Sequence, residues 1–351
     1  MTSNFSVRIF DPRKTEDAGE ITRLREEGYV FVDTYDEQIM ELREIRDPQA
    51  AGQTPAPLSD DPEERVVEYP WRQTLVRIVG PDAYFELRTN RNHELLTVEE
   101  QKRFAASRIG FAGLNVGNPG AVCVALEGGS HAMKLTDFDT LSLTNLNRFR
   151  AGLPDLGVNK ATLTARQILE IDPYYEIELH DKGLSPSTVG SFLSEPKIDL
   201  LVEEMDALPL KIAVREEARR QKIPVVMVTG NGEGILLDIE RYDLEPDLPI
   251  LNGLLRETII SAIHDPMIKT LSKRSKAHLA RDFMGVQYLD SRLNDSFESF
   301  GIALAGIPQL AESSFLRGAA LCYAAKAIIL GRNLPSGRYS FSFSRNLSPV
   351  S

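Results

Sequence analysis

The stretch RIGFAGLNVGNPG, residues 108–120, decides the fold class of this chain. A short apolar run ends at Gly113, and PGAVCVALEGG (119–129) follows with the composition of a helix that stops at a pair of glycines. A strand that turns through glycine into a helix is how nucleotide-binding α/β sheets begin. Because glycine and asparagine tolerate left-handed backbone angles, Gly113, Asn115 and Gly117 permit a tight turn that presents amides to a phosphate.

The pattern after this turn predicts an open, mostly parallel α/β sheet of Rossmann-like type, with helices on both faces. Strand-like and helix-like segments alternate, as right-handed βαβ units require. The expected strands are residues 108–113, 132–139, 175–181, 198–206 and 223–230, and the expected helices are 119–129, 157–172 and 207–222. Ligands of such sheets bind at the carboxyl ends of the strands.

The rest of the chain suggests two domains. Residues 1–87 are expected to form a small α+β extension, with strands at 28–34 and 73–80 and a Pro- and Ala-rich linker near 48–66. Residues 88–351 are expected to form the nucleotide-binding domain. Its last part contains a helix-leaning polar segment, a long helical segment and a closing strand, at residues 265–300, 308–332 and 337–344.

Composition excludes several classes of protein. The formal net charge of −11, with no basic face visible, argues against a nucleic-acid binder. No apolar run is long enough to span a membrane, and the N-terminus lacks the apolar region of a secretory signal. The only cysteines, Cys123 and Cys322, form no CxxC pair, so we expect core residues in a reducing cytoplasm rather than a zinc site.

Acidic residues follow the second and fourth of these strands. Asp137 lies 24 residues after Gly113, the spacing at which a carboxylate accepts hydrogen bonds from ribose hydroxyls. Asp206 ends the strand IDLLVEEMD and is either a magnesium ligand or the N-cap of the helix that begins at Ala207. A turn that only connects a strand to a helix, with solvated acids, is the alternative for Gly113 and Asp137.

Three basic residues lie close together in this acidic chain. Arg148, Arg150 and Lys160 fall within 13 positions, and Lys160 opens a helix. The helix dipole disfavours a lysine there, so contact with an anion explains Lys160 better. Taken alone, these residues also fit an exposed loop with ordinary surface charges.

Four ordered motifs resemble one family. DFDTLSLTNLNRF (137–149) is similar to its DxDxVxxSNLxRQ, and GVNKA (157–161) to its GxxKA. DLLVEEMD, which ends at Asp206, matches a strand that ends in aspartate, and RTNRN (88–92) is similar to RYxRQ. Residues 88–230 thus resemble the ubiquitin-activating (E1-like, ThiF/MoeB) superfamily, which includes the molybdopterin-synthase and thiamin-sulfur-carrier adenylyltransferases.

A closer resemblance concerns the N-terminal extension, LRTNRN, GLNVGN and the last helix. These parts look like the ThiF-type domain of actinobacterial proteins in which that domain is fused to a nitroreductase. The resemblance implies a flavin nitroreductase as a partner in trans.

The family resemblance implies ATP- and Mg²⁺-dependent activation of a carboxylate as an acyl-adenylate, with release of pyrophosphate. It implies a homodimer in which Arg91 reaches the γ-phosphate bound by the partner subunit, and a metal ion held by Asp206. The acid would be the C-terminus of a ubiquitin-like protein, a peptide or a small metabolite. The nucleotide-binding residues it implies are Gly113, Asn115, Gly117, Asp137, Asp139, Asn145, Arg148 and Lys160.

The chain also departs from the family pattern. Asparagines replace common glycines after Gly113, the zinc-binding CxxC pairs of many relatives are absent, and residues 231–300 contain no cysteine. We therefore expect adenylation without zinc and without an enzyme thioester. Two alternatives remain: an NAD(P)-dependent oxidoreductase, which has no γ-phosphate to neutralise, and a degenerate E1-like module that binds without catalysis.

Overall fold

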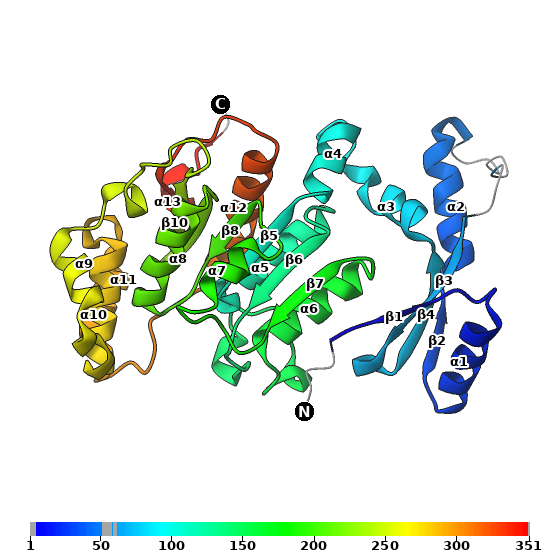
Figure 1. Ribbon diagram of the computed structural model, residues 1–351, viewed down its shortest axis with the longest axis horizontal. Helices are drawn as coiled ribbons and strands as arrows, with labels where there is room; N and C mark the ends of the chain where they lie inside the picture. Colours follow the sequence, from blue (N-terminus) through cyan, green and yellow to red (C-terminus); the bar gives the residue numbers. More distant parts are fainter. Residues whose placement is uncertain (1–4, 51–57, 59–61, 350–351) are drawn as a thin grey trace.

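The structure is a computed structural model that describes residues 5–50, 58 and 62–349. A seven-stranded sheet forms the centre of the molecule. Its strand order is β11-β10-β9-β8-β5-β6-β7 (Figure 1). The bounds are β5 Arg108–Ala112, β6 Ala132–Thr136, β7 Glu176–His180, β8 Leu200–Glu203, β9 Val225–Asn231, β10 Gly234–Glu240 and β11 Gly337–Ser342. Strands β5 to β9 are parallel, whereas β10 and β11 add an antiparallel edge, so the predicted Rossmann-like, mostly parallel sheet is confirmed.

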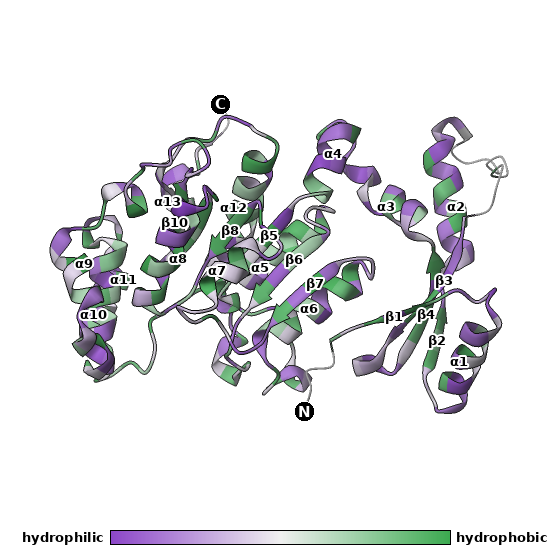
Figure 2. Ribbon diagram, in the orientation of Figure 1, coloured by the Kyte–Doolittle hydropathy of each residue, from purple (hydrophilic) through white to green (hydrophobic). Residues whose placement is uncertain are grey.

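Helices cover both faces of this sheet. Three pack on one face, α5 (Leu114–Leu126), α6 (Lys160–Ile171) and α12 (Ala311–Ile329), and two on the other, α7 (Val189–Ser194) and α8 (Leu208–Arg220). Because side chains alternate along a strand, Phe111 faces the first core and Ala112 the second. Figure 2 shows the hydrophobic colour concentrated on the central strands.

The strand order reverses at β5, which lies between β6 and β8. In open α/β sheets this reversal opens a crevice at the carboxyl ends of the strands. Gly113 forms the turn there, with φ of 90°. A Cβ at Gly113 would lie 2.5 Å from the carbonyl carbon of Glu204, just after β8, so only glycine fits.

Helices α5 and α12 pack unusually closely. A Cβ on Gly120 of α5 would lie 2.7 Å from Leu321, and one on Gly318 of α12 would lie 2.8 Å from Pro119. The missing side chains let the two backbones approach each other. The start of α5 is thereby fixed relative to the first half of α12.

A second, four-stranded sheet lies towards the N-terminus, in the order β1-β3-β4-β2. Its strands are β1 Arg8–Phe10, β2 Val30–Asp33, β3 Glu64–Tyr69 and β4 Thr74–Val79; the helices of this part are α1 Thr15–Glu26, α2 Tyr35–Arg46, α3 Pro81–Thr89 and α4 Val98–Ala105. The linker predicted near 48–66 is wrong at its end, because β3 begins at Glu64 and buries Val66. Residues 51–57 and 59–61 of that prediction lie outside the described residues.

Aromatic side chains join the two sheets. Trp71 donates a hydrogen bond from Nε1 to Glu170 (2.5 Å), and the hydroxyl of Tyr69 donates to the carbonyl of Leu169 (3.1 Å). Tyr84 donates in the same way to Ile171 at the end of α6 (2.8 Å). The sheets share no strand among the described residues, and we propose that a domain boundary lies near residue 87.

Strand β10 was not predicted, nor were the helices after it predicted individually, apart from α12, which was predicted as the helical segment 308–332. The helices are α9 Glu257–His264, α10 Lys273–Met284, α11 Ser291–Ser299 and, after β11, α13 Phe343–Asn346. The predicted closing strand, 337–344, ends at Ser342 because α13 begins there. Strand β10 is hard to recognise in the sequence because it contains the acids Asp238 and Glu240, which are nevertheless fully buried.

Buried ion pairs explain how β10 holds these acids. Glu240 accepts a hydrogen bond from Arg215 of α8 (2.8 Å), and Arg215 also pairs with Glu203 at the end of β8. Lys211 donates to the same Glu203 (3.0 Å). The charges inside this part of the protein are therefore paired, which is the condition for burying them. Among the described residues, no helix is long and apolar enough to cross a membrane.

The contact between α5 and α12 yields a stability prediction. Gly120→Ala is expected to lower the free energy of unfolding by about 1–3 kcal/mol, because the new methyl group overlaps the backbone-anchored Cβ of Leu321. Urea denaturation followed by circular dichroism measures the change. Gly19→Ala in α1 is the matched control, since nothing lies within 4 Å of its Cβ position. Equal stability of the two variants would contradict the close approach.

Candidate functional site

The first turn of α5 is held by an aspartate from the neighbouring strand. Asp137, just after β6, accepts hydrogen bonds from the backbone amides of Leu114 (2.6 Å) and Asp139 (2.8 Å). The side chain is buried, and burial raises the pKa of its carboxyl group despite both hydrogen bonds and the nearby Lys160. The carboxylate thus lies after β6, beside the turn that follows β5, where it fixes the start of α5.

Lys160 lies close to Asp137. The buried ammonium group of Lys160 donates to Oδ2 of the exposed Asp139 (3.0 Å), and its backbone amide donates to the carbonyl of Asp139 (2.8 Å). Asn159 caps α6 through the amide of Thr162 (3.0 Å). The anion that the sequence analysis expected beside Lys160 is therefore a carboxylate of the chain itself in this structure.

The polar run 137–150 is anchored by two apolar side chains. Leu141 and Phe149 pack against Leu163 of α6, so the run is not a free surface loop. Between them, Asn145 closes a turn by accepting hydrogen bonds at Oδ1 from the amide and hydroxyl of Ser142 (both 3.1 Å). This leaves the amide nitrogen of Asn145 as a donor for a ligand.

Arg148 is half-buried at the same edge. Its Nη1 donates to the carbonyl of Thr144 (3.1 Å) and to Asn147 (2.8 Å), whereas its Nε is buried without a partner. Burial lowers the pKa of Arg148, and the charge of Asp206 opposes this effect. The guanidinium of Arg148 therefore lies within electrostatic range of Asp206, the acid that follows β8.

Asp206 is exposed after β8. The N-cap residue of α8 is Ala207 and makes no side-chain capping bond, so the alternative reading of Asp206 as that N-cap is wrong. Among the described residues, no hydrogen bond or ion pair involves its carboxylate. The two preceding acids are buried instead: Glu203 is paired with cations, and Glu204 accepts from the amide of Val228 (2.6 Å).

The expected glycine loop is shorter than its sequence suggests. Helix α5 begins at Leu114, so Asn115 and Gly117 lie within its first turns, and the helix predicted to start at 119 starts five residues earlier. Asn118 is fully buried and donates to Thr164 of α6 (2.9 Å). The asparagines that replace the family's glycines are thus helix residues, and the tight turn needs only Gly113.

Arg91 lies apart from these groups within one chain. Its neighbour Asn92 donates to the carbonyl of Glu127 (3.1 Å), which caps the far end of α5. The 13 residues of α5 span about 20 Å, so the exposed Arg91 lies at the opposite end of the helix from Gly113.

Two residues of this edge were missed or left without a role by the sequence analysis. Arg317 of α12 is 2% exposed, and Arg150 stacks on Phe315 with its guanidinium carbon 4.0 Å from the ring centre. Arg317 lies in a long, largely apolar segment almost 170 residues after Arg148. The one sequence signal that could have marked Arg317 as a site residue is a charged side chain within such a segment.

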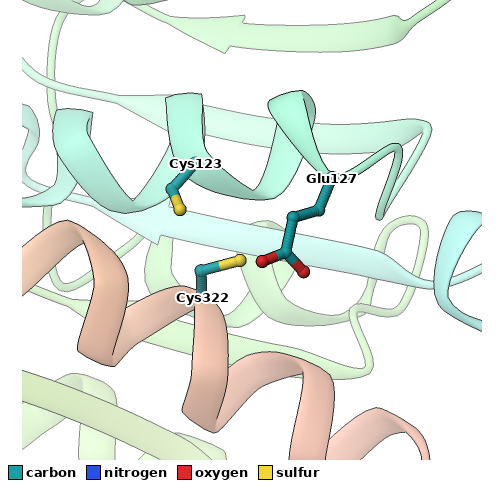
Figure 3. A group of neighbouring side chains, drawn as sticks. All are labelled: Cys123, Glu127 and Cys322. Carbon is teal, nitrogen blue, oxygen red and sulfur yellow. The ribbon is translucent and has the colours of Figure 1, made fainter. Parts of the chain in front are cut away.

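The two cysteines lie against each other, although they are far apart in the sequence. Figure 3 shows Cys123 of α5, Cys322 of α12 and Glu127 pointing toward one another. The hydrogen bond between the thiols raises the pKa of Cys322, as does burial, and lowers that of Cys123. Both cysteines are free, and both pack in or against the main core. Glu127 is paired with Lys326 (2.5 Å).

Comparisons with known proteins agree with this geometry. The ThiF family profile matches residues 87–237. A Mycobacterium tuberculosis protein, MT1398, is 36% identical over 326 residues, which are 92% of this chain and 43% of that protein. The tRNA threonylcarbamoyladenosine dehydratase of Escherichia coli is 31% identical over 131 residues, which are 37% of this chain and 48% of the enzyme. The chain therefore spans less than half of either relative.

Two further similarities concern the catalytic class and the fold. The molybdopterin-synthase adenylyltransferase of Haemophilus influenzae is 25% identical over 195 residues, 51% of this chain and 74% of the enzyme. The crystal structure of the Escherichia coli dehydratase superposes with a TM-score of 0.51 and 20% identity, over 72% of this chain and 97% of that one. Family profile, relatives and fold agree, and the chain therefore carries a ThiF-family domain over residues 87–237.

Proposed function

We propose that this chain is an ATP- and Mg²⁺-dependent adenylyltransferase that activates a carboxylate as an acyl-adenylate. The observation that carries the proposal is the gathering of Asp137, Arg148, Lys160 and Asp206 at one edge of the sheet, around the first turn of α5. An acid for sugar hydroxyls, cations for phosphates and an acid for a metal ion are together what a nucleoside triphosphate requires. The similarity to a molybdopterin-synthase adenylyltransferase supports the same reaction class.

The residues present fit both ATP and Mg²⁺. Two buried polar atoms at this edge lack a partner, Oδ1 of Asn115 and Nε of Arg148, and a nucleotide offers hydroxyl donors and phosphate acceptors. The exposed carboxylate of Asp206 is the hard oxygen ligand that Mg²⁺ prefers. Bound there, the metal ion would neutralise charge on the phosphates.

In this proposal each residue of the edge has one task. Asp137 receives the ribose hydroxyls, and the free amides of the first turn of α5 face the α-phosphate. Lys160 leaves Asp139 for a phosphate oxygen, while Arg148 and the amide of Asn145 bind further oxygens. No general base is needed, because the attacking carboxylate is already an anion.

The activated acid is proposed to pass directly to its acceptor. Cys322 is buried and Cys123 packs against it, which supports a core role for both rather than a thioester. The acid is the C-terminus of a ubiquitin-like protein, a peptide or a small metabolite.

Assembly and location are proposals of the same kind. The position of Arg91 at the far end of α5 supports a homodimer in which it completes the partner subunit's site. The resemblance to fused proteins supports a flavin nitroreductase as a partner in trans. Two free thiols support a reducing cytoplasm.

The reaction is tested by ATP–pyrophosphate exchange with candidate acids of the three classes. Arg148→Gln and Asp206→Asn are each expected to lower the exchange rate about 100-fold: the first removes a cation that stabilises the departing pyrophosphate, and the second removes a ligand of the metal ion that would do the same. Arg46→Gln and Asp36→Asn, which alter surface residues of the N-terminal part by the same charges, are the matched controls. Unchanged exchange in both edge variants would refute the site, and no exchange by a wild-type chain that binds ATP would indicate a degenerate module.

The proposed dimer is tested by mixing inactive variants. Arg91→Ala and Lys160→Ala protomers, mixed in equal amounts and allowed to exchange subunits, are expected to regain about a quarter of wild-type activity, since half the dimers then hold one intact site. Activity is again measured by pyrophosphate exchange.

A second mixture is the control for this experiment. Lys160→Ala with Arg148→Ala should regain nothing, because every site then lacks one of two residues that belong to the same protomer. If the Arg91 mixture also remains inactive, Arg91 does not act across the interface.

A further inference from the structure

The charge on Arg317 is unusually poorly satisfied for a buried arginine. Its Nη1 and Nη2 share a single acceptor, Oε1 of Gln309, at 3.3 Å each, and its Nε is buried without a partner. Burial lowers the pKa of Arg317 to about 10, so it is still a cation at neutral pH. A buried cation with such weak contacts is costly unless an anion joins it.

The guanidinium of Arg317 lies at the carboxyl edge of the sheet. A Cβ on Gly230, near the end of β9, would lie 3.4 Å from its Nη1, so the glycine leaves the space that Arg317 occupies. Glu204 after β8 interacts with it electrostatically. The same Glu204 lies beside Gly117 of α5, which places Arg317 near the first turns of that helix.

Arg150 is held in the same region. It stacks on Phe315, two residues before Arg317, and its Nη1 is buried without a partner. Burial also lowers the pKa of Arg150. Stacking fixes the guanidinium without satisfying its hydrogen-bond donors, as a preformed anion site requires.

Hydrogen bonds tie the segment around Arg148 to α12 and to the residue Gln309 that precedes it. Ser314 of α12 donates to the carbonyl of Arg148 (3.0 Å), and Asn147 donates to the carbonyl of Gln309 (3.0 Å). Arg148 and Arg150 are close enough to Arg317 to disfavour its charge. Three arginines, each with a buried unpartnered nitrogen, therefore lie within electrostatic range of one another.

Little anionic charge of the protein balances this cluster. Burial raises the pKa of Glu204 to about 8, which weakens its negative charge at neutral pH, and its Oε1 already accepts from Val228. Asp206 is exposed, and of the three arginines its charge acts on Arg148. A ligand carboxylate carries one negative charge, whereas a pyrophosphate group carries three or four, so three arginines match pyrophosphate better.

We propose that Arg150 and Arg317 join Arg148 to bind the terminal phosphates of the nucleotide, so that the pyrophosphate leaving group is held against α12. This rests on the proposed function and adds two residues to it. In the reaction a carboxylate oxygen bonds to the α-phosphorus, and the bond from that phosphorus to the bridging oxygen breaks. The electron pair stays on pyrophosphate, where the three guanidinium groups stabilise the added charge, and no proton is transferred.

The test measures the affinity of the full chain for ATP, AMP and inorganic pyrophosphate by calorimetry. Arg317→Met and Arg150→Gln are each expected to weaken pyrophosphate and ATP binding about tenfold or more, with AMP binding within twofold of wild type. Arg317→Lys keeps the positive charge but loses the planar guanidinium that binds two phosphate oxygens at once, so we expect an intermediate loss of pyrophosphate and ATP affinity. Arg332→Gln, three residues after the end of α12 and paired with Glu100 on the surface, is the control with the same change of charge.

Folding and specificity are checked with the same variants. Circular dichroism must show that each is folded, and Arg150→Gln, at a half-buried position, keeps the proposal testable if Arg317→Met does not fold. Unchanged pyrophosphate affinity in folded Arg150→Gln and Arg317→Lys would overturn the inference alone. An equal loss of AMP and pyrophosphate binding would overturn it too, by indicating a general structural effect. A wild-type chain that binds neither ATP nor pyrophosphate would overturn both the inference and the proposed function.

Discussion

The close approach of Gly113 to the backbone after β8 is the constraint on which the edge of the sheet depends. Because no side chain separates them, the turn after β5 and the turn after β8 lie in contact where the strand order reverses. Asp137 then fixes the first turn of α5 from the other side, through the amide of Leu114. Gly113, which has no Cβ, and the carboxylate of Asp137 thus bring the residues that follow β5, β6 and β8 together at one edge of the sheet.

Two groups of buried charges show the difference between structure and function. Glu203, Lys211, Arg215 and Glu240 pair with one another, so their burial needs nothing from outside the chain. Arg317 lies beside Gly230, near the end of β9, and forms no ion pair of this kind; its Nε has no partner, like one nitrogen each of Arg148 and Arg150. This contrast is the basis on which we propose an anionic ligand beside Arg317.

The sequence predicted the parts of the structure that local pattern controls. Alternating strands and helices defined the sheet, and Asp137, singled out by its spacing from Gly113, contacts the amide of Leu114 directly after that glycine. Local pattern failed where tertiary partners override it: β10 contains acids that arginines neutralise, and β3 follows directly on a linker-like composition. It also could not show that Arg317 and Cys322 lie beside residues nearly 170 and 200 positions earlier, because the packing of α5 on α12 brings them there.

The junction between the two sheets has a practical consequence. Trp71 is the only tryptophan of the chain, and it lies where the N-terminal sheet meets Glu170 of α6. Its fluorescence is therefore an intrinsic optical signal of that junction alone. Emission from Trp71 separates loosening of the small sheet from melting of the large one, which circular dichroism follows, without any label attached to the protein.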